Sequence, residues 1–260
     1  MDKIGFIGMG NMAMAMVNGF VKSNAIKSEN ILGFAPNQEK LKMNAERLGF
    51  LPCKTLEALI NESQVIIMAC KPNQVESILA EIKGHIEDRI LVSVVNGWDY
   101  KRYEERLGSA AQIQCIMPNT PASVTEGVFI FEQDNSLTSS KRLWLEELLS
   151  QMGTVIEMPA TLMSAGAAIC GCSPAFIDMM MEAMADAAVL QGIPREEAYR
   201  MVAQTVIGAG KLMLESGKHP GELKDAVCSP GGTTIRGVEA LEHAGMRAAF
   251  MDAINAAAGK

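Results

Sequence analysis

The chain is poor in the residues that most often build metal centres. It has only three histidines among 260 residues, and no two of its six cysteines have the C-x-x-C spacing. These counts argue against a zinc site, and we expect no bound metal. The net charge of −7 argues against a surface for nucleic-acid backbone, so we expect no nucleic-acid partner.

Two further absences concern location. The N-terminus lacks a basic segment followed by an apolar run, so we expect no signal peptide. No uninterrupted apolar run is long enough to span a bilayer. The cysteines lie mostly inside apolar runs, which is typical of buried thiols in a reducing compartment. We therefore expect a cytoplasmic protein without membrane contact.

What is present is an alternation of short apolar runs and helical segments over the first 160 or so residues. Gln64–Cys70 and Ile90–Val95 are runs of buried type, as expected for parallel strands that are covered on both faces. The alternation predicts a Rossmann-type α/β domain with a mostly parallel sheet over residues 1–158. From Thr161 on no strand is expected, which predicts an all-helical domain over 159–260. Gly153–Pro159 is the expected join.

The segment Ala165–Leu190 is hydrophobic nearly all round, broken only at Gly171-Cys-Ser-Pro174. Such a helix must be buried on every side. A domain of about 100 residues cannot easily surround it alone. We therefore expect a homodimer through the C-terminal helices; the alternative is a long core helix inside one monomer.

A glycine turn follows the first expected strand. In Gly8-Met-Gly-Asn-Met-Ala13, Gly8 permits the tight turn and Gly10 lets backbone approach a pyrophosphate. The small Ala13 allows close packing of helix on strand. Asn11 and Met12 open the first helix, so all four positions Gly8, Gly10, Asn11 and Met12 are candidate cofactor contacts.

The end of the second expected strand bears on the choice of dinucleotide. An acid there would bind the ribose diol of NAD, but the chain has Ala35, Pro36 and Asn37, and the first acid is Glu39. Asn37 and Lys40, with backbone around Ala35, could contact a 2′-phosphate. The pattern favours NADPH, with NADH as the alternative donor, although no arginine is placed for bidentate capture.

Two further loops follow expected strands. Lys71-Pro72 and Asn96-Gly97 come at carboxyl ends, where such sheets bind ligands. We expect Lys71, Pro72 and Asn96 to border the nicotinamide half. Lys71 could equally be a solvated loop lysine.

Near the C-terminus, Pro230-Gly231-Gly232 forbids a regular element, and a helix is expected to begin at about Thr233. Free N–H groups at a helix start, beside the positive end of its dipole, suit a carboxylate. Thr233 and Thr234 add hydroxyls at the same place. The alternative is a plain turn with threonine caps.

Together these segments resemble the pyrroline-5-carboxylate reductase family. The resemblance covers essentially the whole chain, and its most specific part is the segment around Ser229–Thr234. The motifs that carry it are Gly5-Phe-Ile-Gly-Met-Gly-Asn-Met-Ala13, Lys71-Pro72, Met117-Pro-Asn-Thr-Pro-Ala122 and Leu223-Lys-Asp-Ala-Val-Cys-Ser-Pro-Gly-Gly-Thr-Thr-Ile235.

The resemblance implies NADPH-linked reduction of 1-pyrroline-5-carboxylate to L-proline, the last step of proline biosynthesis. It implies a helical dimerisation domain and a pocket shared by two subunits; family dimers often form rings of five, which would make a decamer. Backbone amides around Gly231, Gly232, Thr233 and Thr234 would hold the substrate carboxylate. The Thr234 hydroxyl would reach the ring nitrogen, as the catalytic side chain.

Three departures from the family pattern leave the substrate's ring size open: Asn96 stands where small residues are usual, Cys170 and Cys172 replace a more polar lining, and Cys115-Ile116 stand where an arginine often precedes the Met-Pro-Asn motif. One alternative is an NADP-linked reductase of another cyclic imine or of a keto acid, for which Lys211 would lie on a suitable helix. Another is an NADP(H)-binding sensor without catalysis.

Overall fold

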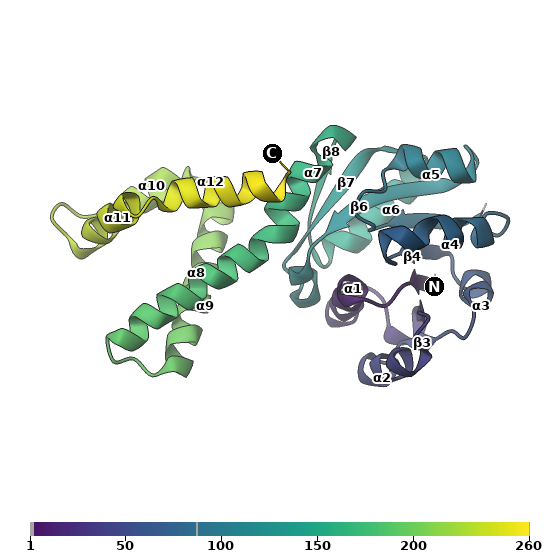
Figure 1. The fold of residues 1–260 in the computed structure, drawn as a ribbon, viewed down its shortest axis with the longest axis horizontal. Coiled ribbons are helices and arrows are strands. Elements are labelled where there is room, and N and C mark those ends of the chain that lie inside the picture. The colour runs from purple at the N-terminus through teal and green to yellow at the C-terminus, as the bar shows by residue number, and fades with distance from the viewer. Residues whose placement is uncertain (1–2, 87, 260) are drawn as a thin grey trace. The chain divides into compact units, whose positions relative to one another are not determined.

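The structure is a computed structural model that describes residues 3–86 and 88–259. The chain divides into two compact units, Met1–Gly171 and Cys172–Lys260 (Figure 1). The predicted boundary at residue 158 concerns functional domains and stays a prediction. Each unit is described below by itself.

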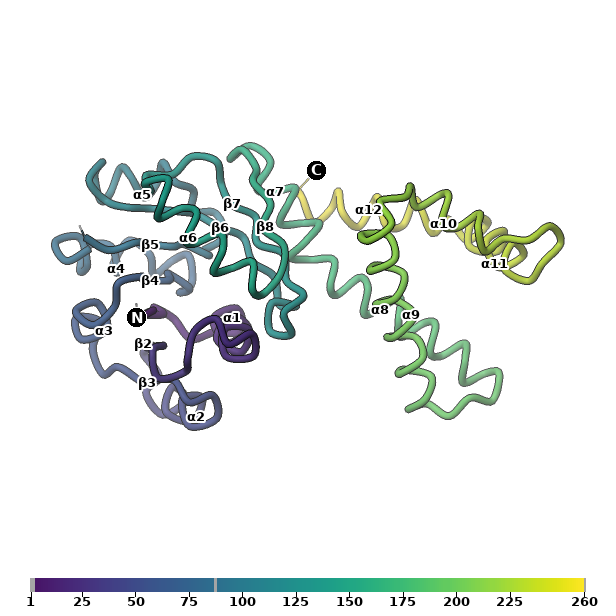
Figure 2. Tube along the Cα trace, turned by 180° about the vertical axis from the view of Figure 1, so that it is seen from behind, coloured from purple at the N-terminus to yellow at the C-terminus, as the bar shows by residue number. Residues whose placement is uncertain are grey.

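The first unit contains an eight-stranded sheet in the order β3-β2-β1-β4-β5-β6-β7-β8. All neighbouring pairs are parallel except β6 with β7, so the predicted mostly parallel Rossmann-type sheet is confirmed. Seen from behind, the purple N-terminal chain lies between β2 and β4 (Figure 2). The strands are β1 Ile4–Ile7, β2 Ile31–Phe34, β3 Leu51–Pro52, β4 Val65–Met68, β5 Ile90–Ser93, β6 Gln112–Pro118, β7 Gly127–Asn135 and β8 Gly153–Met158.

Helices cover both faces of this sheet, because its central strands are apolar on both sides. Phe6 of β1 belongs to a core cluster with residues of α1, α2 and α6, whereas Ile7 belongs to a second cluster with residues of α3, α4 and α5. Both side chains are at most 1% exposed. The helices are α1 Asn11–Lys22, α2 Gln38–Leu48, α3 Leu56–Glu62, α4 Val75–Ile82, α5 Tyr100–Leu107, α6 Ser139–Ser150 and α7 Met163–Ala167. Short 3-10 turns are η1 Ser28–Asn30, η2 Pro72–Gln74, η3 Thr120–Val124 and η4 Ala160–Leu162.

The regular elements of the second unit, over its described residues, are all helices, as predicted. The expected break near Gly171 is a π-helical stretch, Ala168–Cys172, immediately before α8. The small core of the second unit is formed by Ala185 of α8 with Ala198 and Val202 of α9. The helices are α8 Ser173–Leu190, α9 Arg195–Ser216, α10 Pro220–Ala226, α11 Thr233–His243 and α12 Met246–Ala257.

The apolar residues of α8 are largely exposed in the single chain. Of its residues only Ala185 is buried, while Met179 is 69% exposed and Leu190 85% exposed. The alternative of a core helix inside one monomer is therefore wrong, and the exposed methionines fit an interface between helices. By length and composition alone the helical stretch Ala160–Leu190 could also cross a membrane. The core helices of soluble proteins share this length and composition.

Several elements differ from expectation. The expected join at 153–159 is strand β8, which pairs with β7 along its whole length. One face of β8 stays exposed, so polar and apolar residues mix along it. In sequence such a strand resembles a linker. The two-residue strand β3 and the short helices α3, α4, α5 and α10 were also not predicted. Each spans at most eight residues, too short for a clear periodic signal.

Candidate active site

The glycine turn after β1 requires glycine at its first position. Gly8 has φ of +95°, and a Cβ built there would lie 2.6 Å from the backbone oxygen of Ala69. The Gly8 N–H donates to the Phe34 carbonyl oxygen at 2.8 Å. The turn is therefore fixed between the ends of β2 and β4, where no larger residue fits.

Gly10 serves a different purpose. It is the N-cap of α1 with φ of −82°, and no side chain caps the helix there. A Cβ on Gly10 would meet no protein atom within 4 Å. The first amides of α1, at Asn11 and Met12, are therefore presented beside open space at the positive end of a 12-residue helix. Ala13 is fully buried, which lets α1 lie close on the sheet.

The turn after β2 carries no carboxylate before Glu39, which lies in the first turn of α2. The Asn37 side chain caps α2, since its Oδ1 accepts from the Lys40 backbone N–H at 2.9 Å. This orients the Asn37 Nδ2 group as a remaining donor. Gln38, which the sequence did not single out, donates from Nε2 to the Ala35 oxygen at 2.9 Å and so shapes the turn that contains Pro36.

Lys71 and Pro72 follow β4 and are exposed. The Lys71 backbone N–H donates to the Gln74 Oε1 at 3.2 Å, which holds the start of η2. The preceding Cys70 lies against Gly8. Burial raises the pKa of the Cys70 thiol to about 11, so it stays protonated at neutral pH.

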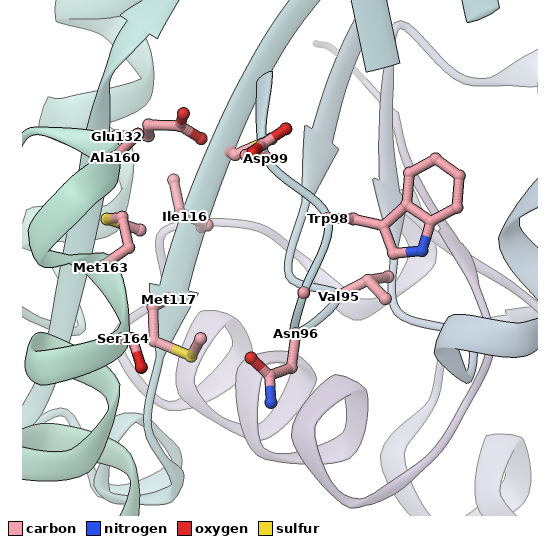
Figure 3. A pocket seen from close by; sticks show the side chains of 12 residues that line it. Val95, Asn96, Trp98, Asp99, Ile116, Met117, Glu132, Ala160, Met163 and Ser164 are labelled. Atoms are coloured by element: carbon pink, nitrogen blue, oxygen red, sulfur yellow. The ribbon is translucent and has the colours of Figure 1, made fainter. Parts of the chain in front are cut away.

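Asn96 lies on the rim of a cavity of about 280 Å³ within the first unit (Figure 3). Glu132 and Asp99 are at one end of this cavity and Asn96 at the other. The walls come from the loop after β5, from β6 and β7, and from η4 and α7. They are formed by Val95, Asn96, Gly97, Trp98, Asp99, Cys115, Ile116, Met117, Glu132, Ala160, Met163 and Ser164.

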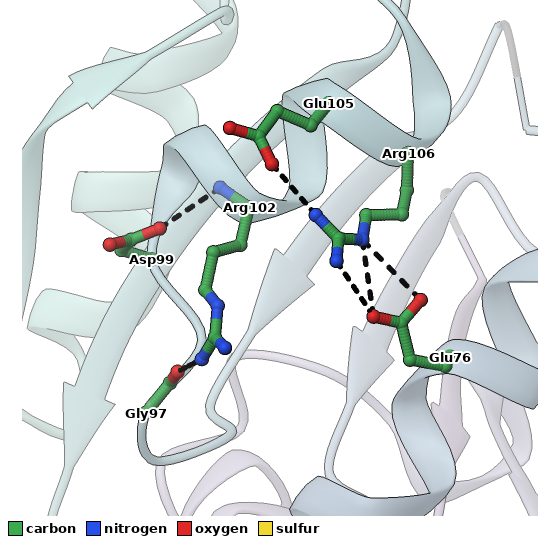
Figure 4. A network of polar contacts seen from close by, with 6 residues as sticks. All are labelled: Glu76, Gly97, Asp99, Arg102, Glu105 and Arg106. Atoms are coloured by element: carbon green, nitrogen blue, oxygen red, sulfur yellow. Dashed lines mark hydrogen bonds and ion pairs between the residues drawn. The ribbon is translucent and has the colours of Figure 1, made fainter.

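A cationic network holds the loop after β5. Arg102 donates from Nη1 to the Gly97 carbonyl oxygen (Figure 4). The guanidinium carbons of Arg102 and Arg106 lie 5.2 and 5.6 Å from the centre of the Trp98 ring, within range of cation–π attraction. Arg106 is paired with Glu76 of α4 at 2.9 Å. The loop that carries Asn96 is thus tied to α4 and α5.

The C-terminal glycine turn lies in the second unit. Gly231 has φ of +70°, and Gly232 is the N-cap of α11, with no side chain capping that helix. The Gly232 N–H donates to the Ser229 oxygen at 3.0 Å. Thr233 and Thr234 are the first residues of α11. The alternative in which threonine side chains cap the helix is not what the structure contains, since the cap position is Gly232.

Arg236 is a residue that the sequence reasoning missed. Its Nε donates to the Gly232 oxygen at 3.3 Å, which folds the side chain back over the first turn of α11. It adds a full positive charge to the partial charge of the helix start. In the sequence, the position of Arg236 four residues after Gly232 was the pattern that could have indicated it.

The predicted residues thus gather in two places. Those around Gly8, Ala35, Lys71 and Asn96 follow β1, β2, β4 and β5, which are neighbours in the sheet, so they share its carboxyl edge. Gly231, Gly232, Thr233 and Thr234 belong to the other unit. Among the described residues no group of three or more His, Cys, Asp and Glu side chains is arranged to hold a metal ion.

Two family models match the chain. One, pyrroline-5-carboxylate reductase dimerisation, matches residues 160–260. The other, NADP oxidoreductase coenzyme F420-dependent, matches residues 3–97. The first covers α8 and its exposed apolar face; the second covers the glycine turn.

Relatives and solved structures match over nearly the whole length. The pyrroline-5-carboxylate reductase of Methanosarcina acetivorans is 39% identical over 97% of this chain and 94% of its own. The Escherichia coli enzyme of that name is 36% identical, with the same coverage of both chains. A crystal structure of Plasmodium falciparum pyrroline carboxylate reductase with NADP bound has a TM-score of 0.88 at 31% identity, covering 99% of this chain and 96% of its own. The chain therefore belongs to the pyrroline-5-carboxylate reductase family.

Proposed function

We propose that this protein reduces 1-pyrroline-5-carboxylate to L-proline with NAD(P)H, the last step of proline biosynthesis. The observation that carries this proposal is the 39% identity over 97% of the chain to a relative named for that activity. Keto-acid reduction and a non-catalytic sensor are less consistent with a likeness that extends over both units.

The dinucleotide is assigned to the carboxyl edge of the sheet. The pyrophosphate would lie on the open backbone at Gly10, with the amides of Asn11 and Met12 and the turn at Gly8 around it. Ala35, Pro36 and Asn37 would receive the adenosine ribose, and the absence of an acid there before Glu39 supports NADPH. Lys71, Pro72 and Asn96 would border the nicotinamide half.

The substrate carboxylate is assigned to the start of α11. Gly231 and Gly232 expose the amides of Thr233 and Thr234 there, and Arg236 adds a cation beside them. These groups would bind the anion by charge-assisted hydrogen bonds. The pocket would be shared by two subunits, with the dinucleotide from one and α11 from the other.

The proposed reaction does not require a strong general acid or base. NADPH, when held by the glycine turn after β1, would supply the hydride for the carbon of the C=N bond, whose electron pair would move to nitrogen. Because a protonated imine is already electrophilic, the chain's own groups contribute mainly by positioning the ring and stabilising charge near its nitrogen. The Thr234 hydroxyl would be the hydrogen-bond partner of that nitrogen.

The quaternary structure follows from the second unit. We infer a homodimer through the C-terminal helices, supported by the dimerisation family match and the exposed apolar face of α8. The same proposal includes a decamer of five such dimers. It assigns dinucleotide binding to residues 1–158 and dimerisation with substrate binding to residues 159–260. It also includes a cytoplasmic location without membrane contact.

The test is oxidation of NADPH at 340 nm with 1-pyrroline-5-carboxylate, compared with NADH and with keto acids. Thr234→Ala should lower kcat by roughly one to two orders of magnitude, because a hydrogen bond to the reacting nitrogen is lost. The Kd for NADPH should stay within about twofold, since Thr234 is not among the residues assigned to the dinucleotide. Thr234→Ser, which keeps the hydroxyl, is the matched control. Equal losses for Ala and Ser, or a parallel loss of NADPH affinity, would contradict the assigned role.

A further inference from the structure

Glu132 of β7 is a buried carboxyl group that the proposed reaction does not use. It is 1% exposed and lines the cavity of about 280 Å³ beside the loop after β5 (Figure 3). Its Oε2 accepts from the Tyr100 N–H, the first amide of α5, at 3.0 Å. Its Oε1 has no hydrogen-bond partner among the described residues.

The cavity beside Glu132 has no basic residue in its lining: none of the described residues that line it is Lys, Arg or His. Burial raises the pKa of the Glu132 carboxyl, and the negative charges of Asp99 and Asp134 raise it further, against the Tyr100 hydrogen bond and the Cys115 thiol, which lower it. Arg102, a cation of the loop network, donates to the Gly97 oxygen.

Capping of α5 accounts for only one of the two carboxyl oxygens of Glu132. A carboxylate at a helix start is favourable, and Oε2 makes that contact. The second oxygen is left without a donor, although buried polar atoms are nearly always paired. Protonation does not remove the problem, because the new O–H would need an acceptor. A donor inside the cavity would supply the missing partner.

The other walls show what kind of partner fits. Ile116, Met117 and Met163 form an apolar surface, and Asp99 adds a second carboxylate at the Glu132 end (Figure 3). A small ligand with a charged donor at one end and a hydrocarbon body matches this arrangement. A volume of about 280 Å³ is near the lower limit of ligand pockets, which suits a compact molecule.

We propose that this cavity binds a small protonated amine, with the ammonium group donating to Glu132 Oε1 and its hydrocarbon part packing on Ile116, Met117 and Met163. The site goes beyond the proposed function, because none of the residues assigned to the substrate carboxylate lines it. Asn96 is common to this cavity and to the proposed nicotinamide border. An amine in the cavity would therefore contact the loop that faces the cofactor.

The experiment is calorimetric titration of the full-length protein, without cofactor or substrate, with isobutylammonium. The neutral probe of the same shape is isobutanol. We expect isobutylammonium to bind and isobutanol to bind at least about tenfold more weakly, since a charge-assisted hydrogen bond to a buried carboxylate is lost. Because neither probe has a carboxylate or an imine, the result does not depend on whether the protein reduces 1-pyrroline-5-carboxylate.

Two variants locate the site. Glu132→Gln should weaken isobutylammonium at least about tenfold, whereas Asp134→Asn, an exposed acid of the same strand that does not line the cavity, should change the Kd by less than about threefold. In the unaltered protein the affinity should also fall on acidification, as Glu132 becomes protonated. This pH series needs no variant, so it tests the proposal even if Glu132→Gln does not fold. Equal binding of isobutanol, an unchanged Kd in Glu132→Gln, or affinity independent of pH would overturn the proposal.

Discussion

Gly8 and Gly10 stand two residues apart in one turn, yet alanine at these positions should affect stability very differently. At Gly8, φ of +95° costs an L residue about 1–3 kcal/mol. The added Cβ would also lie 2.6 Å from the backbone oxygen of Ala69, a contact that only a backbone shift can relieve. Overpacking of this kind costs about 1–3 kcal/mol more.

The total for Gly8→Ala is therefore about 2–6 kcal/mol, a large part of the roughly 5–15 kcal/mol that holds a typical domain folded. At about 2–4 °C per kcal/mol for a chain of this size, the Tm should fall by roughly 4–24 °C. NADPH binding should be lost with the turn.

Gly10→Ala should leave stability almost unchanged. With φ of −82° and no atom within 4 Å of the new Cβ, alanine meets neither strain nor a clash. A small loss from the poorer N-cap is offset by the reduced entropy of the unfolded chain. The methyl group does occupy the space proposed for the pyrophosphate. The Kd for NADPH should therefore rise at least about tenfold, because backbone can no longer approach the phosphates.

The assays are thermal unfolding, monitored by circular dichroism, and NADPH titration by fluorescence. Gly108→Ala is the control for strain alone: φ there is +88°, but no atom lies within 4 Å of its Cβ and it follows α5, away from the turn. It should lower the Tm less than Gly8→Ala and leave NADPH affinity intact. If Gly10→Ala binds NADPH as the unaltered protein does, the dinucleotide does not lie on this turn.

Three further outcomes are expected. Asn37→Ala with Lys40→Ala should raise the Kd for NADPH several-fold more than that for NADH, and an unchanged ratio in titrations would remove the basis for 2′-phosphate recognition at this turn. Because burial raises the Glu132 pKa in the folded state, its ionisation costs stability only above the unfolded pKa of about 4.3. Glu132→Gln should therefore raise the Tm at pH 8 but not at pH 4, and a gain of equal size at both would show that charge is not the cause. Met179→Glu, on the exposed face of α8, should lower the mass measured by light scattering from dimer to monomer; an unchanged mass would place the interface elsewhere.

The parts of the fold that were predicted are those with a strong local pattern. The run at β4 is apolar throughout, that at β5 is apolar up to Ser93, and α1 and α2 begin and end where the sequence places them. Strand β8 was missed for a tertiary reason: it lies at the edge of the sheet, where only one face is covered, so Ile156 is 38% exposed. Nothing local distinguishes such a strand from a linker.

In the site, too, local features could be predicted and those that depend on tertiary structure could not. The glycine turn could be recognised because backbone geometry alone requires Gly8, and this requirement is visible in one residue type. The cavity could not, because Asn96 and Glu132 are 36 positions apart and meet only through the pairing of β5, β6 and β7. An acid inside the apolar run of β7 was a signal for Glu132, but not for the amide at Tyr100 that binds it.

Catalysis and assembly should be linked through α8. Hydride transfer requires the reacting atoms at about 3–3.5 Å, so the groups that hold substrate and dinucleotide must be held in a fixed geometry. The second unit has only a small core of its own, around Ala185, Ala198 and Val202. A unit with so little buried surface gains rigidity from an interface. Met179→Glu should therefore abolish most imine reduction as well as the dimer, while the Kd for NADPH, assigned wholly to the first unit, stays within about twofold. Full activity in a monomeric variant would show that one chain builds the whole pocket.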